Sequence, residues 1–283
     1  VINFLVTYFF KEQKQRKEIG WFRNALYMFL LYKALVYVFH FRTLFSDKAM
    51  VFTQQAFPGG IKNLAFLLNN HYSKGLAIGC IVLWFGLSVL GLLRRSGYIA
   101  NAMLWLLVLN MNSYVYATLT AGDYLLNQLL FFNIFFCRNS FSTRFNDFKT
   151  AFHNMALAGI KIQICLCYFL AGWFKLTDAD WLNGSAVYHI FQIPEYTSGL
   201  LMSLPWGLCM ILNYATMGYQ LLFPFSIWFR PFKIYLLAFG IIQHLIIAFC
   251  MGLFSFGIIM IICYLLFLKY DQSPGNHIVA GRV

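Results

Sequence analysis

Ionisable side chains inside apolar segments are the residues with which this sequence could do chemistry. Lys175 ends the run CYFLAGWFK, His244 lies in GIIQHLIIAFC, and Asp123 follows Gly122 at the start of another apolar run. An amine in an apolar, aromatic setting can act as a base near neutrality, and imidazole and carboxylate groups can position or transfer protons. We therefore predict Lys175, His244 and Asp123 as the catalytic residues of one site.

Each of these residues also has an ordinary structural interpretation. Lys175 can be a boundary lysine whose amine extends to lipid headgroups beside Trp173 and Trp181. His244 can be a packed membrane histidine, and Asp123 can cap the start of a helix. The similar depth expected for the three side chains favours a shared pocket near one face of a membrane.

Other polar residues are assigned to the same pocket or to the apolar segments around it. We expect the pocket to be lined by Asn112, Asp178, Asp180 and Trp181. Lys33 and Lys161 lie more than a helical turn inside apolar segments, where pairing with a carboxylate or with backbone carbonyls is the expected arrangement. The sequence carries no motif for a metal site, a phosphate-binding loop or a serine hydrolase, so no metal is predicted.

The composition indicates what kind of chain positions these residues. Of the 283 residues, 61% are hydrophobic, 20% aromatic and 11% charged, and the mean hydropathy is +0.68. A water-soluble domain carries about a quarter charged residues, so an ordinary cytosolic enzyme, a disordered protein and a nucleic-acid binder are excluded. We predict an all-α, polytopic transmembrane helical bundle, because the apolar runs are continuous and lack the alternation of a β-barrel.

About eight segments are expected to cross the membrane. They are residues 22–42, 76–93, 97–118, 122–137, 153–175, 203–229, 233–251 and 253–269. Most basic residues near their ends fall on the side that holds both termini, so both termini are expected in the cytoplasm. The predicted pocket then lies on the outer face.

The chain divides by composition into three parts. Residues 1–20 are expected as an interfacial segment of basic and aromatic residues, 21–270 as the transmembrane domain, and 271–283 as a short polar tail.

One stretch of the transmembrane domain resembles a known membrane family. Residues 168–188, YFLAGWFKLTDADWLNGSAVY, are similar to the signature of HTTM-domain proteins, the family that includes vitamin K-dependent gamma-glutamyl carboxylase. The resemblance continues in Gly122–Asp123, in NSYVY at 112–116 and in QHLIIAFCMGLFSFGI at 243–258, and it covers most of residues 20–270 in order. The chain thus resembles a bacterial stand-alone HTTM protein.

The resemblance implies a role for Lys175. In the carboxylase, a lysine of this signature is thought to deprotonate vitamin K hydroquinone on the lumenal side, and Lys175 stands at the matching position. This implies a membrane enzyme or catalytic subunit that acts on a quinol- or lipid-like molecule and on an exported peptide or protein. Asp123 and His244 would position the ligand or transfer protons.

Two departures argue against full gamma-carboxylation. Asn112, which cannot titrate, stands where the carboxylase has a histidine, and a short polar tail stands in place of a long extramembrane β-rich region. Fold analogy alone does not fix the chemistry.

A second interpretation is a non-catalytic membrane subunit, or a maturation factor of an envelope or secretion complex. Such a subunit would dock an exported partner. The residues alone leave open whether the chain is an enzyme. Under both interpretations the expected partners are membrane lipid, an exported peptide or lipoprotein and another envelope protein, with no nucleic acid. The expected location is a bacterial inner membrane, with the site on the periplasmic face.

Overall fold

The computed structural model describes residues 16–45, 73–115, 118–136 and 146–268, and all regular secondary structure within these ranges is helical. The helices of the first half are α2 (Arg16–Phe39), α3 (Phe41–Phe45), α5 (Lys74–Leu92), α6 (Tyr98–Tyr114) and α7 (Ala121–Asn133). The second half holds α8 (Asn146–Lys175), α9 (Ala179–Leu182), α10 (Ala186–Phe191), α11 (Gly199–Met202), α12 (Trp206–Ser226), α13 (Arg230–Cys250), α14 (Phe254–Tyr264) and the short 3-10 helix η4 (Leu265–Phe267).

Each of the eight segments predicted to cross the membrane contains a helix, but the helices differ in length. Four of the described helices are long and apolar enough to cross a bilayer, namely Lys17–Phe39, Lys74–Leu92, Phe148–Lys175 and Arg230–Cys250. About 20 residues are needed for a span. The α7 helix has 13 residues and α6 has 17, so these helices end earlier than their apolar segments predicted. The all-helical class is confirmed for the described ranges, whereas the count of eight spans stays a prediction.

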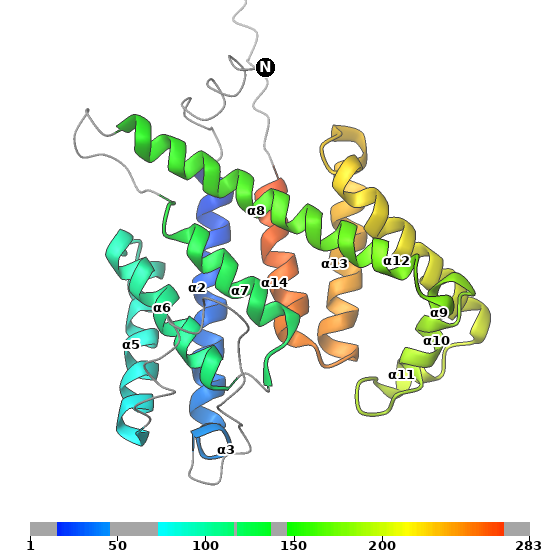
Figure 1. Ribbon diagram of the computed structural model, residues 1–283, viewed down its shortest axis with the longest axis horizontal. Coiled ribbons are helices and arrows are strands. Elements are labelled where there is room, and N and C mark those ends of the chain that lie inside the picture. The colour runs from blue at the N-terminus through cyan, green and yellow to red at the C-terminus, as the bar shows by residue number, and fades with distance from the viewer. Residues whose placement is uncertain (1–15, 46–72, 116–117, 137–145, 269–283) are drawn as a thin grey trace, which may run out of the picture.

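The helices pack in pairs around a common core (Figure 1). α2 packs along α5, α8 along α12, and α13 along α14. α7 joins these pairs because it contacts α6, α8 and α14. The core contains large aromatic side chains without solvent exposure, among them Phe22, Tyr27, Trp84 and Phe223.

Short helices α9, α10 and α11 form a separate lobe beside α12, at the right of Figure 1. A small cluster of Val187, Phe191, Leu201 and Cys209 forms its interior. The lobe is tied to the end of α13 by a backbone hydrogen bond of 2.8 Å from Ser198 N to Cys250 O.

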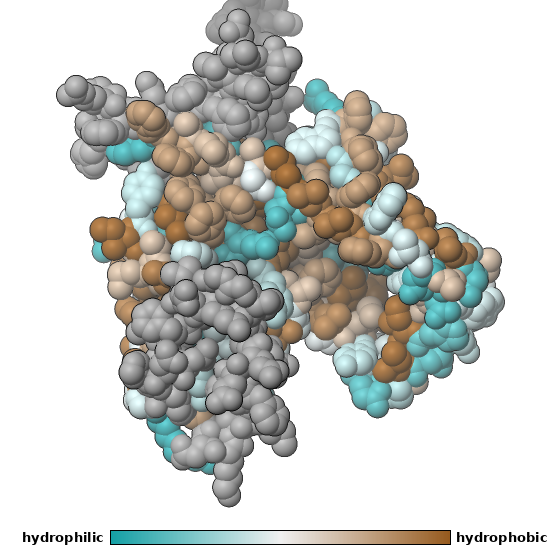
Figure 2. Space-filling view, in the orientation of Figure 1, coloured by the Kyte–Doolittle hydropathy of each residue, from teal (hydrophilic) through white to brown (hydrophobic). Residues whose placement is uncertain are grey.

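Many large apolar side chains point outward. Figure 2 shows them over much of the face that α8, α12 and α13 form. Phe174, Ile234 and Phe249 are each about two-thirds exposed or more, at 65%, 72% and 67%. Exposed apolar surface of this extent is expected of helices that face lipid, and it agrees with the four helices that are long enough to cross a membrane.

Two glycines allow α14 to approach its neighbours closely. A Cβ on Gly122 of α7 would collide with the backbone of Ser255 and Phe256. A Cβ on Gly257 would collide with the carbonyl oxygen of His244 on α13. Small residues at such crossings let helix backbones pack against each other in membranes.

Replacing Gly122 by alanine is expected to destabilise the fold, because the backbone of α14 must shift to admit the added methyl group. An overpacked core of this kind costs about 1–3 kcal/mol. Thermal unfolding of the purified protein, followed by tryptophan fluorescence, measures the effect. Gly79→Ala is the control, since a Cβ at Gly79 of α5 meets nothing within 4 Å; equal unfolding temperatures for the two variants would contradict the close contact.

Candidate functional site

The residues predicted for one pocket lie in three places. Lys175, Asp178, Asp180 and Trp181 lie at the corner where α8 meets α9. Asn112 and Asp123 lie together between α6 and α7, and His244 lies on α13 among aromatic residues of other helices. The predicted meeting of Lys175, Asp123 and His244 in one pocket is therefore absent from the contacts of the described residues.

Lys175 is the last residue of α8 and its side chain is half-buried. Its Nζ donates a hydrogen bond of 3.3 Å to the carbonyl oxygen of Ala171. The same atom lies 4.5 Å from the centre of the Trp181 ring, which is within the range of a cation–π interaction. Lys175 and Trp181, both assigned to the site from the sequence, are therefore in contact through the ammonium group and the aromatic ring.

The two carboxylates at this corner make local hydrogen bonds, and one of them caps a helix. Asp178 is the N-cap of α9, and its Oδ1 accepts hydrogen bonds from Asp180 N at 2.9 Å and from Trp181 N at 3.3 Å. Asp180 accepts a hydrogen bond of 3.3 Å from the Ser185 hydroxyl. Both aspartates are exposed, so they belong to the surface of the α9–α11 lobe and line no enclosed pocket.

Asp123 joins two helices through its two carboxylate oxygens. It is the third residue of α7, and its Oδ2 accepts hydrogen bonds from Thr120 N at 2.8 Å and from Thr120 Oγ1 at 3.0 Å. Its Oδ1 forms an ion pair with Lys33 Nζ of α2. Both residues are buried, at 2% and 6% exposure. Of the two partners expected for Lys33, a carboxylate or backbone carbonyls, the structure shows the carboxylate.

A cation–π contact connects this ion pair to a chain of hydrogen bonds that includes Asn112. Lys33 Nζ lies 5.7 Å from the centre of the Tyr37 ring. The Tyr37 hydroxyl donates to Asn112 Oδ1 at 2.9 Å, and Asn112 Nδ2 donates to Asn127 Oδ1 at 3.4 Å. Asn112 and Asp123 are therefore parts of one buried polar network that links α2, α6 and α7.

Removing one member of the Lys33–Asp123 ion pair is expected to destabilise the protein more than removing both. Lys33→Met or Asp123→Asn leaves a single buried charge, which costs about 3–5 kcal/mol. The double variant Lys33→Met with Asp123→Asn should recover part of that loss. A double-mutant cycle on the unfolding temperature measures the coupling; additive losses would mean that the two charges do not interact.

His244 lies in a cluster of three buried tyrosines, Tyr168 of α8, Tyr219 of α12 and Tyr264 of α14, which we call the Tyr–His cluster. The Tyr168 hydroxyl is 2.7 Å from His244 Nε2 and also hydrogen-bonds to the Tyr264 hydroxyl. The Tyr264 and Tyr219 hydroxyls are 3.0 Å apart. Four helices thus bring one imidazole and three phenols into a continuous hydrogen-bonded chain.

Gly240 makes room for this cluster. A Cβ at Gly240, one helical turn before His244, would collide with the hydroxyls of Tyr219 and Tyr264. Phe256 of α14 covers the other side of the imidazole, with the ring centres 5.5 Å apart. The imidazole is consequently enclosed by aromatic rings and is 3% exposed.

One polar atom of the cluster has no partner. His244 Nδ1 is buried and makes no hydrogen bond within the described part of the chain. Whichever ring nitrogen of the neutral imidazole carries the proton, Nε2 is occupied by Tyr168 and Nδ1 is left over. A buried polar atom without a partner is costly, and its presence in a native structure needs an explanation.

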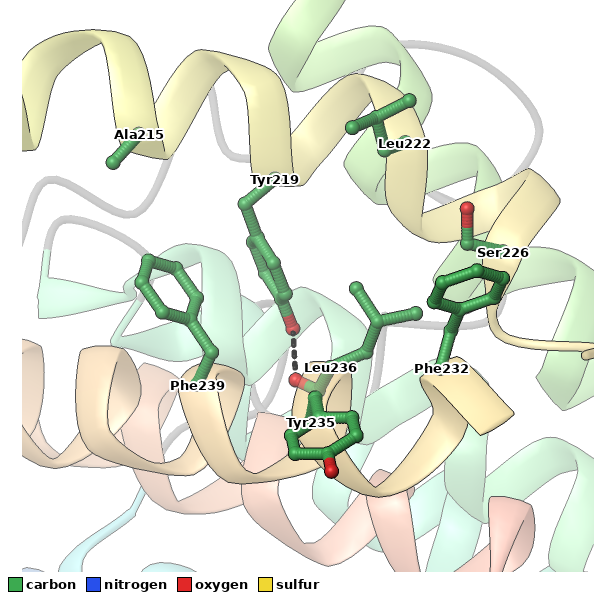
Figure 3. Close-up of a pocket in the computed structure, with 8 residues that line it drawn as sticks. All are labelled: Ala215, Tyr219, Leu222, Ser226, Phe232, Tyr235, Leu236 and Phe239. Atoms are coloured by element: carbon green, nitrogen blue, oxygen red, sulfur yellow. Dashed lines mark hydrogen bonds between the residues drawn. The ribbon is translucent and has the colours of Figure 1, made fainter. Parts of the chain in front are cut away.

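An apolar groove between α12 and α13 reaches the cluster (Figure 3). It has a volume of about 460 Å³ and is lined by Ala215, Tyr219, Leu222, Ser226, Phe232, Tyr235, Leu236 and Phe239. The Tyr219 hydroxyl crosses the groove and donates a hydrogen bond of 3.2 Å to Leu236 O. Tyr219 therefore belongs both to the wall of the groove and to the Tyr–His cluster.

The chain was also compared with known proteins. No family model, curated protein or solved structure matches it. The resemblance to HTTM proteins stays a prediction from the residues quoted above.

His244 could be recognised as a candidate from the sequence, but its tyrosine partners could not. Long apolar segments contain these partners, Tyr168, Tyr219 and Tyr264. In such a segment nothing in the sequence distinguishes a tyrosine from the other aromatic residues. A signal was present, because the hydroxyl of a buried tyrosine usually needs a hydrogen-bond partner. Which partner it finds depends on how the helices face one another.

The arrangement can bind and transfer protons. Each phenol can accept one hydrogen bond while it donates another, so a chain of phenols can pass a proton from one end to the other. The imidazole is the one base of the cluster. Acid–base chemistry and hydrogen bonding are the functions that the imidazole and the three phenols support.

Proposed function

We propose that this chain is an integral membrane protein that takes a quinol- or lipid-like molecule from the bilayer into the α12–α13 groove and exchanges protons with it through the Tyr–His cluster. The observation that carries the proposal is the double position of Tyr219. Its ring lines the groove, and its hydroxyl begins the hydrogen-bonded chain that ends at His244. The protein would act as a carboxylase-related membrane enzyme or as a catalytic subunit.

The proposal includes an orientation in a bacterial inner membrane. The start of α2, the α5–α6 turn and the α12–α13 turn lie toward the upper end of Figure 1. These segments carry the exposed basic residues Lys17, Arg95 and Arg230, and basic residues favour the cytoplasmic face. This supports cytoplasmic termini and eight membrane-embedded helices, with the Lys175 corner and the outer ends of α13 and α14 toward the periplasm.

The proton would move along the cluster in a balanced series of steps. A ligand hydroxyl that replaces Leu236 O as the partner of Tyr219 can give its proton to the phenol oxygen while Tyr219 gives its own to Tyr264. Tyr264 passes a proton to Tyr168 in the same way, and Tyr168 passes one to His244 Nε2. The net change is one proton lost by the ligand and one gained by the imidazole.

Replacing Tyr219 by phenylalanine tests the contact with the ligand. We expect Tyr219→Phe to weaken binding of a decyl-substituted benzoquinol about tenfold, the effect of one lost hydrogen bond of about 1.4 kcal/mol. Titration calorimetry on the protein in lipid nanodiscs measures the affinity. The matched control is Tyr235→Phe: Tyr235 lines the same groove, but its hydroxyl points away from Tyr219 in Figure 3. Equal losses in both variants would contradict a specific role for the Tyr219 hydroxyl.

Lys175 is the alternative base implied by the family resemblance, and a second experiment separates it from the cluster. If Lys175 removes the quinol proton, Lys175→Met should abolish the dioxygen-dependent loss of quinol. Lys175→Arg should keep the cation–π contact with Trp181 and leave the unfolding temperature unchanged. Absorbance of the quinol measures turnover. Full turnover in Lys175→Met, together with loss in His244→Gln, would assign the base to the Tyr–His cluster.

The second candidate function is a non-catalytic subunit that docks an exported peptide, a lipoprotein or another envelope protein. The α9–α11 lobe favours it, because the lobe exposes large apolar side chains beside acidic ones. Tyr196 and Leu200 are 59% and 71% exposed, and Glu195 is exposed next to them. Under this function neither Tyr219→Phe nor Lys175→Met would alter activity of the complex.

A further inference from the structure

The groove between α12 and α13 ends beside a glutamine of α13. Phe232, Leu236 and Phe239 line the groove from this helix, at spacings of four and three residues. Four residues beyond Phe239 stands Gln243. Residues at spacings of three and four lie on the same face of a helix. Gln243 therefore lies on the face of α13 that is turned toward α12, about one helical turn beyond Phe239.

Contacts between the two helices show which residue of α12 stands at the level of Gln243. The ring centres of Phe239 and Tyr219 are 4.8 Å apart, and a Cβ on Gly240 would collide with the Tyr219 hydroxyl. Because α12 and α13 are joined by a short turn and run in opposite directions (Figure 1), one turn further along α13 corresponds to one turn earlier along α12. That position is Ala215, which lines the groove at the same end as Phe239 (Figure 3). Its methyl group cannot hydrogen-bond to the glutamine amide.

The amide oxygen of Gln243 has no partner. Its Oε1 is buried and makes no hydrogen bond within the described part of the chain. An unsatisfied buried acceptor costs free energy, and its presence needs an explanation. A leucine, which is similar in size, would avoid this cost among the apolar side chains that line the groove. The oxygen is therefore available to accept a hydrogen bond from a hydroxyl group that enters the groove.

We propose that Gln243 determines the specificity of the groove by accepting a hydrogen bond from a second hydroxyl group of the ligand. This role rests on the proposed function, in which a first ligand hydroxyl binds Tyr219. A helical turn advances about 5.4 Å, and Tyr219 and Gln243 are separated by about that distance along the groove. Two hydroxyls at opposite positions of one benzene ring have a comparable separation, whereas a ligand with one hydroxyl can occupy only one of the two positions. The groove therefore selects a benzoquinol over a phenol or a fatty alcohol with the same chain.

The affinities of three ligands test the proposal, namely the decyl-substituted benzoquinol and the two decylphenols that each lack one of its hydroxyls. Titration calorimetry on the protein in lipid nanodiscs, without dioxygen, measures them. The wild type should bind the quinol about tenfold more tightly than either phenol, because each phenol forms one hydrogen bond fewer. In Gln243→Leu the quinol should lose this advantage over the phenol that keeps the hydroxyl bound to Tyr219, and the affinity for that phenol should equal that of the wild type.

Gln220→Leu is the matched control. Gln220 of α12 also has a buried Oε1 without a hydrogen-bond partner among the described residues. It follows Tyr219 directly in the chain and so points about 100° away from the groove. This variant should bind all three ligands as the wild type does. Neither leucine variant should lower the unfolding temperature, since each removes an unsatisfied buried oxygen.

The outcomes separate this role from the proposed function on which it rests. Equal affinity of the wild type for the quinol and the phenols, with a loss in Tyr219→Phe, would overturn the role of Gln243 alone. Failure of all three ligands to bind would overturn the proposed function as well. An equal loss in Gln220→Leu and Gln243→Leu, or a fall in the unfolding temperature of Gln243→Leu, would also overturn the role, because the amide would then act in the fold.

Discussion

The buried ion pair between Lys33 and Asp123 is the interaction on which the arrangement of the helices depends. Inside an apolar bundle an isolated charge is expensive, and a charge with a hydrogen-bonded partner is tolerated. Asp123 is held at the start of α7 by Thr120, so its free oxygen fixes where Lys33, and with it α2, must lie. The position of α7 in turn fixes α14, because Gly122 packs directly on the backbone of Phe256.

The same constraint explains the other polar side chains of α2. Near the middle of this helix the Tyr27 hydroxyl donates to Asn101 Oδ1 at 2.8 Å and accepts from Asn133 Nδ2 at 2.9 Å. Gly91 of α5 leaves space for the Tyr27 ring. Thus polar contacts at the middle and in the second half of α2 bind it to α6 and α7, and apolar packing binds it to α5. The Tyr–His cluster joins α8, α12, α13 and α14 in a comparable way.

The sequence was sufficient to predict features that are determined by the order of residues along a single helix. The helical class and the segments that contain the helices follow from local patterns, and the position of Lys33 inside an apolar segment indicated that its amine needs a buried partner. Contacts between side chains of different helices could not be predicted, because they depend on how each helix is rotated about its own axis. Lys175, Asp123 and His244 were expected at a similar depth, but a similar depth leaves open which helix faces which, and their side chains join three different groups. The tyrosine partners of His244 were missed for the same reason.

The two buried polar networks meet at α14, and this position makes them interdependent. Phe256 provides the backbone against which Gly122 packs and the ring that covers His244. Gly252 lies in the turn between α13 and α14 and has a φ of 68°. This backbone conformation suits glycine and lets the chain reverse direction between the two helices. A shift of α14 that opened space at His244 would therefore also move the start of α7 and the carboxylate of Asp123. A ligand that displaced α14 at the Tyr–His cluster would in this way change the position of Asp123 relative to Lys33.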